Sequence, residues 1–305
     1  MKLLISGANG QVGWQLQRTL APLGEVVALT RSELDLADAA APSVVREIRP
    51  DILINAGAYT AVDKAESEAK LAHAVNAEGP GRFANELARY GGLMIHYSTD
   101  YVFDGTKKEP YTEEDPTNPL NVYGQSKLAG ELAIAASGCA YLILRTSWVY
   151  DSRGKNFLRT VLRVARERNE LRMVDDQHGA PTWARAIAET TAAIIAKSML
   201  EKKSESWQRT GVYHLTAAGS TTWAGFAQAI LDAHEELLAW PADTGEFSAP
   251  LLAKRVAPIT SEMFKAAARR PRNSRLSNAK LERDFGLKLP EWRHLLRLAM
   301  LDTIR

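Results

Sequence analysis

A tyrosine and a lysine four positions apart are the residues whose types and spacing most directly suggest chemistry. Tyr123 and Lys127 form a Tyr-x-x-x-Lys pattern, and residues at i and i+4 share one face of a helix. A free phenol has a pKa of about 10 and is a poor acid–base catalyst at neutral pH. A neighbouring ammonium favours the phenolate and lowers that pKa. The pair therefore predicts a site that donates or removes a proton near physiological pH.

A glycine-rich turn near the N-terminus predicts a site for a pyrophosphate. Gly7, Gly10 and Gly13 are spaced GxxGxxG, after an apolar run at 2–6 and at the start of a helical run at 11–20. Glycine allows the tight turn and the close approach of backbone to phosphate, and the free N–H groups of the helix start attract an anion. With the tyrosine and lysine, this turn predicts a nicotinamide dinucleotide as cofactor.

The end of the second predicted strand, 26–30, indicates which dinucleotide is used. An acidic residue there would bind the ribose hydroxyls of NAD. Counting about 18–20 residues on from Gly13 reaches Thr30 and Arg31 instead. Arg31 is placed for a 2′-phosphate, so the sequence favours NADPH and leaves NADH open as a second cofactor. Asp35 follows slightly later, towards the adenine end.

Two further segments supply side chains for a substrate. Ser98 and Thr99 follow the fourth predicted strand, 93–98, and ligands of doubly wound folds bind outside the carboxyl ends of strands. Either hydroxyl is a candidate to hold a substrate carbonyl. The basic run 269–275 fits a nucleotide diphosphate, because arginine forks match phosphate oxygens.

The elements that must position these residues alternate between short apolar runs and helical runs. Strands are expected at 2–6, 26–30, 51–56, 93–98, 141–146 and 212–216, and helices at 11–20, 43–48, 68–90, 122–136, 157–168, 185–199 and 222–239. Strands without clean period-2 alternation are typical of a parallel sheet covered on both faces. The prolines and weak periodicity of 241–275 predict an irregular loop.

The fold class predicted from this pattern is α/β with a doubly wound, Rossmann-like parallel sheet. We expect a dinucleotide-binding domain at 1–147 and a smaller substrate domain at 148–305, and later segments are free to return to the first sheet. A length of 305 residues fits two domains.

Composition excludes several other classes of protein. Lys and Arg total 38 against 36 Asp and Glu, a net charge of +2 that gives no reason to expect nucleic acid. The single cysteine, Cys139, cannot form an intrachain disulfide. The apolar run at the N-terminus is too short for a signal peptide, and no run approaches the roughly 18 residues of a membrane span. We therefore expect a cytoplasmic protein without a membrane partner. The six histidines show no metal-ligand spacing, so no metal site is expected.

Longer segments carry a resemblance to a known family. They are GQVGWQLQ (10–17), TAVDKAESE (60–68), HYSTDYVFDG (96–105), PLNVYGQSKLAGE (119–131), LRTSWVY (144–150), DDQHGAPT (175–182) and ARRPRNSRL (268–276). With the glycine turn and Tyr-x-x-x-Lys, the chain resembles the extended short-chain dehydrogenases/reductases, and within them the dTDP-4-dehydrorhamnose reductase family. The resemblance implies NAD(P)H-dependent reduction of dTDP-6-deoxy-L-lyxo-4-hexulose to dTDP-L-rhamnose. That is the last step of a bacterial pathway supplying cell-surface polysaccharide such as lipopolysaccharide.

The resemblance also implies a role for individual residues. Tyr123 would give the proton to the C4 oxygen, Lys127 would bind the nicotinamide ribose, and Thr99 would hydrogen-bond the reacting oxygen. The implied cofactor contacts are Gly10, Gln11 and Val12 at the pyrophosphate, Asp35 and Leu36 near the adenine, and Ala58, Tyr59, Thr60 and Tyr97 along the groove. The implied sugar-nucleotide contacts are Thr99, Asp100 and Trp148, to which the basic run adds Arg270 and Asn273.

Three alternatives stay open. Some relatives form a homodimer around Mg²⁺ through a Glu at the position of Gln15, and the amide here disfavours that metal-linked dimer. A 4,6-dehydratase or 4-epimerase is a second reading, but dehydratases carry Asp-Glu after the threonine, whereas Tyr101 follows Asp100. The third is a non-catalytic subunit of the same fold, like the regulatory β subunit of methionine adenosyltransferase. The complete set of Thr99, Tyr123 and Lys127 speaks against it.

Overall fold

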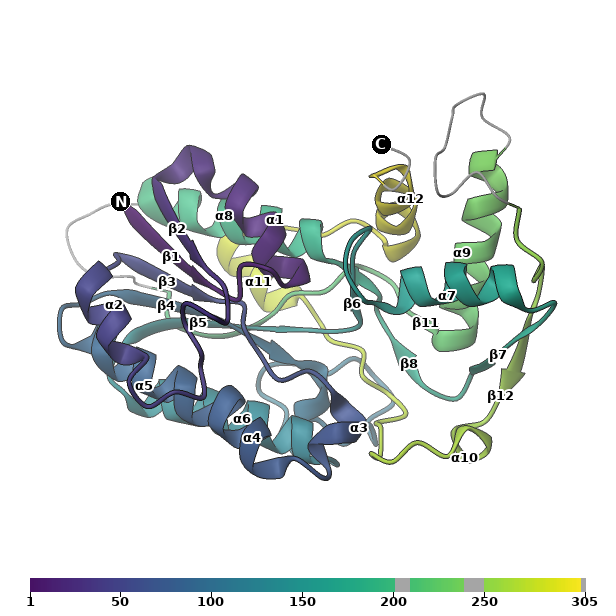
Figure 1. The fold of residues 1–305 in the computed structure, drawn as a ribbon, viewed down its shortest axis with the longest axis horizontal. Coiled ribbons are helices and arrows are strands. Elements are labelled where there is room, and N and C mark those ends of the chain that lie inside the picture. Colours follow the sequence, from purple (N-terminus) through teal and green to yellow (C-terminus); the bar gives the residue numbers. More distant parts are fainter. Residues whose placement is uncertain (201–208, 239–249, 303–305) are drawn as a thin grey trace.

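The structure is a computed structural model that describes residues 1–200, 209–238 and 250–302. A six-stranded parallel sheet forms its centre, with strand order β10-β5-β4-β3-β1-β2 (Figure 1). Its strands are β1 (Lys2–Ser6), β2 (Glu25–Leu29), β3 (Ile52–Asn55), β4 (Leu93–Thr99), β5 (Ala140–Thr146) and β10 (Gly211–His214). The predicted doubly wound parallel sheet is thus confirmed.

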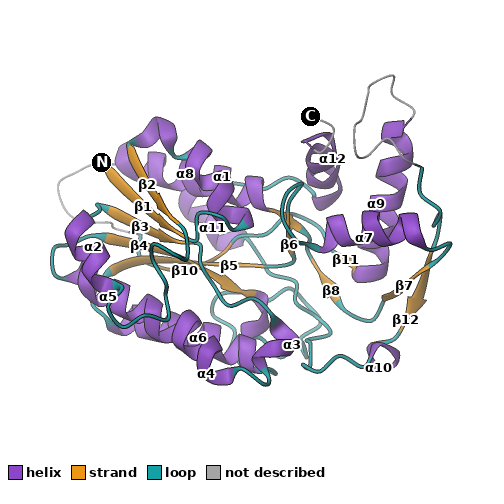
Figure 2. Ribbon diagram, in the orientation of Figure 1, coloured by secondary structure: helices purple, strands orange, loops and turns teal. Residues whose placement is uncertain are grey.

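Helices cover both faces of this sheet (Figure 2). One face carries α1 (Gln11–Thr19), α8 (Ala184–Leu200) and α11 (Ala279–Phe285), and the other carries α2 (Pro42–Ile48), α5 (Gly79–Ala88) and α6 (Val122–Ala136). Alternate residues of the strands point to opposite faces. Leu3 and Ile5 therefore join the first layer, and Leu4 and Leu53 join the second.

Short helical elements complete the first half of the chain. They are η1 (Ala21–Leu23), α3 (Val62–Ala65), α4 (Ala69–His73), the π-helical segment η2 (Ala74–Glu78) and η3 (Asp100–Val102). The long helical stretch expected at 68–90 is confirmed: it consists of the consecutive segments α4, η2 and α5, which together cover 69–88. Pro80 in the first turn of α5 lacks an N–H and cannot continue a regular α-helical ladder from the preceding turn.

The second lobe is built from helices and short strands. Its helices are α7 (Phe157–Glu167), α9 (Trp223–Leu238), α10 (Ser261–Phe264) and α12 (Trp292–Asp302). Its strands are β6 (Val149–Tyr150), β7 (Leu171–Val174), β8 (His178–Gly179), β9 (Thr182–Trp183), β11 (Thr221–Thr222) and β12 (Val256–Ile259), paired β6–β9, β7–β12 and β8–β11.

The irregular loop expected at 241–275 is wrong over part of its length. β12 and α10 lie within it, and β12 pairs in parallel with β7, more than eighty positions earlier in the chain. Because the partner strand is so distant in the sequence, no local periodicity predicts the pairing of β12. Residues 241–249 of the expected loop lie outside the described residues.

The two halves of the sequence do not separate at residue 147. β10, α8 and α11 come from the second half, yet all belong to the layers of the central sheet (Figure 2). One apolar cluster joins Leu3 and Ile54 of the sheet to Leu158 of α7 and Phe226 of α9. Among the described residues, no helix is both long and apolar enough to cross a membrane.

Candidate active site

A groove of about 870 Å³ lies at the carboxyl ends of the sheet strands, where doubly wound folds bind their ligands. Most residues predicted to bind the cofactor line it: Gly7, Gly10, Gln11, Val12, Arg31, Asp35, Leu36, Ala58, Tyr59, Thr60, Tyr97, Tyr123 and Lys127. Gly13 and Thr30 are not among the lining residues. The residues predicted to bind the cofactor, several of them from the family resemblance alone, thus line one groove.

The glycine turn is shaped by close backbone packing. Gly7 has a φ of +73°, and a Cβ there would lie 2.6 Å from the backbone nitrogen of Gly57. A Cβ on Gly13 would lie 2.2 Å from the carbonyl oxygen of Gly7. Gly13 thus lets α1 start against the turn. Gly10 begins α1 without a side-chain hydrogen bond to its free N–H groups, which leaves those donors for an anion.

At the far end of the groove, Arg31 forms an exposed ion pair with Asp35. The guanidinium Nε lies 3.3 Å from the Asp35 carboxylate, and the two side chains are 73% and 38% exposed. Such pairs contribute little stability, so a phosphate can compete for the arginine. Thr30 bonds to a neighbouring side chain: its N–H and its hydroxyl both donate to the Glu33 carboxylate at 2.8 Å.

Helix α6 carries the tyrosine and lysine to the groove wall. Its first turn is capped by Asn121, which accepts from Gly124 N–H at 2.8 Å and donates to the carbonyl of Arg269 at 2.7 Å. A Cβ on Gly124 would lie 2.2 Å from the Tyr101 carbonyl oxygen. The missing side chain thus allows the helix to approach η3 closely, which sets the depth of Tyr123.

Lys127 is buried, with 1% of its surface exposed. Its ammonium donates to the carbonyl oxygen of Tyr97 at 2.6 Å and lies 3.0 Å from Nε2 of His96. Burial lowers the pKa of Lys127 to about 8, and the Glu131 carboxylate one turn along the helix opposes that shift. Both hydrogen-bond partners of the Lys127 ammonium, His96 and Tyr97, thus belong to β4.

Tyr123 has a raised pKa, contrary to the prediction that Lys127 would lower it. Burial raises the pKa of Tyr123 to about 12, and the Asp100 charge adds to the rise, although a hydrogen bond with Thr99 opposes it. The prediction is wrong because the cost of desolvating a phenolate dominates this site. Tyr123 is consequently a neutral phenol at physiological pH, poised to donate a proton.

Thr99 and Asp100 lie behind the phenol. The Thr99 hydroxyl donates to Asp100 at 3.0 Å and accepts from the N–H of Tyr101 at 3.2 Å. Burial raises the pKa of Asp100 to about 7, opposed by hydrogen bonds from Ser274 and Thr99. The ring of Tyr101 meets that of Tyr123 edge-on, with centroids 6.0 Å apart. The structure thus brings Thr99, Asp100 and Tyr123 together.

The predicted basic run is engaged with the rest of the protein. Arg270 donates two hydrogen bonds to Asp63, at 3.0 and 2.7 Å. Asn273 donates to the carbonyls of Lys107 and Glu109 and accepts from Arg275. The amide of Asn273 has no capacity left for a substrate, so it positions the 107–109 loop instead.

Trp148 is buried against another tryptophan. Its ring stacks on that of Trp223 with centroids 3.7 Å apart, and 9% of its surface is exposed. Its φ of +47° is unusual for a bulky residue. Such conformations persist only where the surroundings impose them, so the stacking on Trp223 of α9 holds Trp148 in place after β5.

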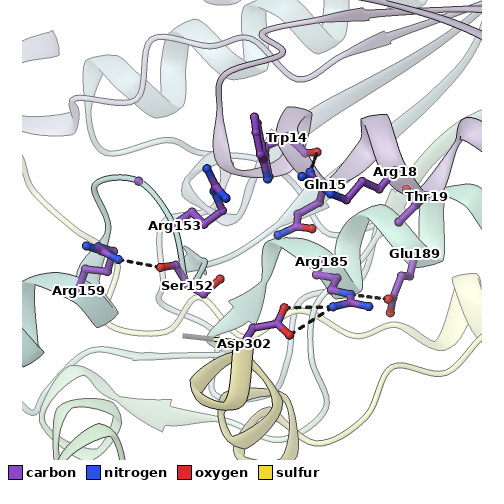
Figure 3. Close-up of a pocket in the computed structure, with 11 residues that line it drawn as sticks. Trp14, Gln15, Arg18, Thr19, Ser152, Arg153, Arg159, Arg185, Glu189 and Asp302 are labelled. Atoms are coloured by element: carbon purple, nitrogen blue, oxygen red, sulfur yellow. Dashed lines mark hydrogen bonds and ion pairs between the residues drawn. The ribbon is translucent and has the colours of Figure 1, made fainter. Parts of the chain in front are cut away.

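A second pocket, of about 920 Å³, is lined by Gln15 and shares Trp14 and Arg153 with the groove (Figure 3). The Gln15 amide donates to both oxygens of Asp151, at 3.2 and 2.9 Å. Arg185 pairs with Glu189 and Asp302 in the wall. Over residues 1–200, 209–238 and 250–302, no three His, Cys, Asp or Glu side chains are grouped to hold a metal ion.

Sequence reasoning missed the buried polar side chains beneath the groove. They are Ser6, Asn55, Asn76, His96, Glu131 and Arg145. The Asn76 amide accepts from the N–H of Tyr59 and donates to the carbonyl of Tyr59. Arg145 forms a buried ion pair with Glu131 at 2.6 Å. A polar residue closing an otherwise apolar strand, as in ILIN (52–55), was the available signal.

The doubly wound sheet, the glycine turn and the Tyr-x-x-x-Lys helix define the class of protein as an extended short-chain dehydrogenase/reductase. Within that class, the chain belongs to the RmlD substrate binding domain family, whose model matches residues 1–304.

Named relatives match the chain over nearly its whole length. A dTDP-4-dehydrorhamnose reductase of Burkholderia thailandensis is 51% identical and covers 100% of this chain and 99% of its own. The protein of that name from Escherichia coli K12 is 43% identical, over 96% and 94%. A Bacillus anthracis dTDP-4-dehydrorhamnose reductase solved in complex with NADP is 34% identical, over 99% of both chains, with a TM-score of 0.86. A Thermus thermophilus UDP-glucose 4-epimerase, 19% identical with a TM-score of 0.76, shares the fold.

Proposed function

We propose that this protein reduces the C4 ketone of dTDP-6-deoxy-L-lyxo-4-hexulose to dTDP-L-rhamnose with NADPH. The relatives named above carry this activity in their names at up to 51% identity, and the Bacillus anthracis structure contains NADP. One observation in the site carries the proposal furthest. A neutral Tyr123 phenol stands at the groove wall beside the Thr99 hydroxyl, with Lys127 one turn along the same helix.

The groove fits a nicotinamide dinucleotide. The uncapped start of α1 offers N–H donors to the pyrophosphate, and Arg31 lines the groove near Asp35 and Leu36, where it would bind the 2′-phosphate of NADPH. Lys127 has two acceptors for three N–H donors, and it lines the groove. Its remaining donor would bind the nicotinamide ribose.

When bound, NADPH would supply a hydride to C4 of the sugar. Tyr123 donates its phenolic proton to the C4 oxygen, so that no alkoxide is released. Thr99 orients that oxygen by hydrogen bonding. The Lys127 ammonium would stabilise the phenolate that remains by its positive charge. A proton from solvent then restores the phenol.

We propose that the sugar nucleotide lies over Thr99, Asp100 and Trp148, with Arg270 near its diphosphate. Arg270 is held by Asp63 with its side chain 17% exposed, so it would act from a fixed position. Asp100, with its pKa raised to about 7, can donate to a sugar hydroxyl when protonated and accept from it when ionised. We place the reaction in the cytoplasm, where NADPH and nucleotide sugars are made.

The deciding experiment is NADPH oxidation, followed by near-UV absorbance. The substrate is dTDP-4-keto-6-deoxyglucose, with and without an added 3,5-epimerase. Oxidation that requires the epimerase supports the proposal. Oxidation without the epimerase indicates a reductase for the unepimerised sugar. Tight NADPH binding without oxidation in either arm favours the non-catalytic alternative.

A further inference from the structure

A row of buried polar side chains runs beneath the groove from the glycine turn to Lys127. Ser6, Asn55 and His96 occupy adjacent positions on β1, β3 and β4, because Ser6 pairs with Asn55 and Asn55 pairs with His96. Their exposed fractions are 0, 1 and 0%. The register of the sheet therefore places three polar groups side by side inside the protein.

Hydrogen bonds join the row end to end. The Ser6 hydroxyl is 2.6 Å from Oδ1 of Asn55, and Nδ2 of Asn55 is 2.9 Å from Nδ1 of His96. The other imidazole nitrogen, Nε2, is 3.0 Å from the Lys127 ammonium. Asn55 and His96 thus each have a partner on both sides within the row, as a buried polar network requires.

The location of the row connects it to the site. It lies on the face of the sheet that carries Leu4, Leu53 and Met94, and closes that apolar layer at the groove edge. Ser6, Asn55 and His96 do not line the groove, but Lys127 does, and so do the residues that follow the first three, namely Gly7, Ala56 and Tyr97. The row therefore acts on the groove through Lys127.

The direction of every bond in the row depends on the charge of Lys127. When the ammonium donates to Nε2 of neutral His96, Nδ1 carries the proton and needs an acceptor. In the structure as it stands, Nδ2 of Asn55 donates to Nδ1, which leaves the imidazole proton on Nε2. A charged Lys127 therefore requires the opposite orientation of the Asn55 amide, with Oδ1 accepting from Nδ1 and Nδ2 donating to the Ser6 hydroxyl. A neutral amine at Lys127 reverses all of these bonds. Burial and the Lys127 charge hold the pKa of His96 well below its usual value, which keeps the imidazole neutral.

We propose that His96 is a positioning residue for Lys127. By accepting at Nε2 it holds the ammonium against the Tyr97 carbonyl and keeps it charged, and Asn55 and Ser6 fix the imidazole. The importance of this contact for turnover rests on the proposed reductase function, but the contact itself does not.

The effect on Lys127 has a definite sign. The Lys127 ammonium faces His96 and the Tyr97 carbonyl on β4. The Glu131 carboxylate on α6 also acts on it, and that carboxylate is ion-paired with Arg145 of β5. Burial lowers the pKa of Lys127, and an acceptor for the ammonium works against that shift. Removing the imidazole acceptor therefore lets the pKa fall further. A lost hydrogen bond to a charged group lowers the pKa of Lys127 by about one unit or more.

The test measures Lys127 directly in the full-length protein. Lysine labelled with ¹³C at Cε is incorporated, the Lys127 resonance is assigned with Lys127→Met, and its shift is followed from pH 6 to 11. The variants are His96→Gln, whose amide reaches the position of Nε2, and His96→Asn, whose shorter amide reaches only that of Nδ1. His214→Gln is the matched control, since His214 is equally buried on β10 and does not line the groove.

The expected result is a lower Lys127 pKa in His96→Asn and a value close to wild type in His96→Gln and His214→Gln. The alkaline limb of turnover moves with it in His96→Asn. A Lys127 pKa that is the same in all four proteins overturns the proposal, and so does a shift in His96→Gln equal to that in His96→Asn. Absent turnover in wild type counts against the reductase function alone, because the titration needs no substrate.

Discussion

The ammonium of Lys127 lies 2.6 Å from the carbonyl oxygen of Tyr97, so a strand backbone, rather than the Tyr123 phenol, fixes the lysine. The two side chains of the Tyr-x-x-x-Lys pattern thus have separate supports. Thr99 bonds the phenol, and β4 holds the ammonium. Each can be altered without removing the support of the other, which makes their contributions separable by mutation.

Tyr123→Phe should leave NADPH binding close to wild type and reduce turnover on the order of 10²-fold or more, because it removes only the proton donor. The measurement pairs a fluorescence titration of NADPH with steady-state kinetics. Tyr141→Phe, on β5 at the base of the sheet, is the control. Turnover like that of wild type would remove Tyr123 from the mechanism.

Arg31→Ala should weaken NADPH roughly tenfold or more while NADH changes little, because a lost charge-assisted hydrogen bond affects only the cofactor with the 2′-phosphate. Dissociation constants for both cofactors check this. Arg46→Ala tests for a general effect of removing a positive charge, since Arg46 pairs with Glu86 on α5 and does not line the groove. An equal loss for both cofactors would contradict the assignment.

Gly124→Ala should destabilise the fold by roughly 1–3 kcal/mol, because its Cβ would lie 2.2 Å from the Tyr101 carbonyl oxygen. Turnover should fall as well, since α6 must shift and carry Tyr123 with it. Urea unfolding and kinetics measure the two effects. Ala135→Ser, on the exposed side of the same helix, should change stability by less than about 0.5 kcal/mol. A fully active Gly124→Ala protein would show that the close approach does not position the phenol.

Asp100→Asn should remove a decline of stability between pH 4 and 7. The folded pKa of about 7 lies above the ordinary value of 3.8, so the folded protein keeps a proton that the unfolded chain releases in this window. Stability therefore falls as pH rises, by roughly 4 kcal/mol at full ionisation. The difference in free energy of unfolding between wild type and variant, measured from pH 4.5 to 8, isolates this group. A difference that does not change with pH would contradict the raised pKa.

Local patterns explain what the sequence could predict. The glycine turn and the Tyr-x-x-x-Lys spacing each lie within a few residues, and the elements around them, β1, α1 and α6, begin and end within one residue of expectation. The groove-lining residues follow from those elements and from the family resemblance.

Properties set by distant contacts could not be predicted. The raised pKa of Tyr123 depends on the burial of α6 against η3. The saturation of the Asn273 amide depends on carbonyls more than 160 positions away. The polar row exists only because three strands pair in one register. None of these relations has a short-range signature in the chain.

The return of α8, β10 and α11 to the central sheet limits how this scaffold can be re-engineered. The chain leaves the sheet layers after β5, comes back at α8, departs again after β10 and revisits them at α11 before ending in α12. A chimera with a foreign second lobe therefore cannot be made by a single fusion point. It requires coordinated exchange of the segments between β5 and α8, between β10 and α11, and after α11, with the junctions left in the parent scaffold.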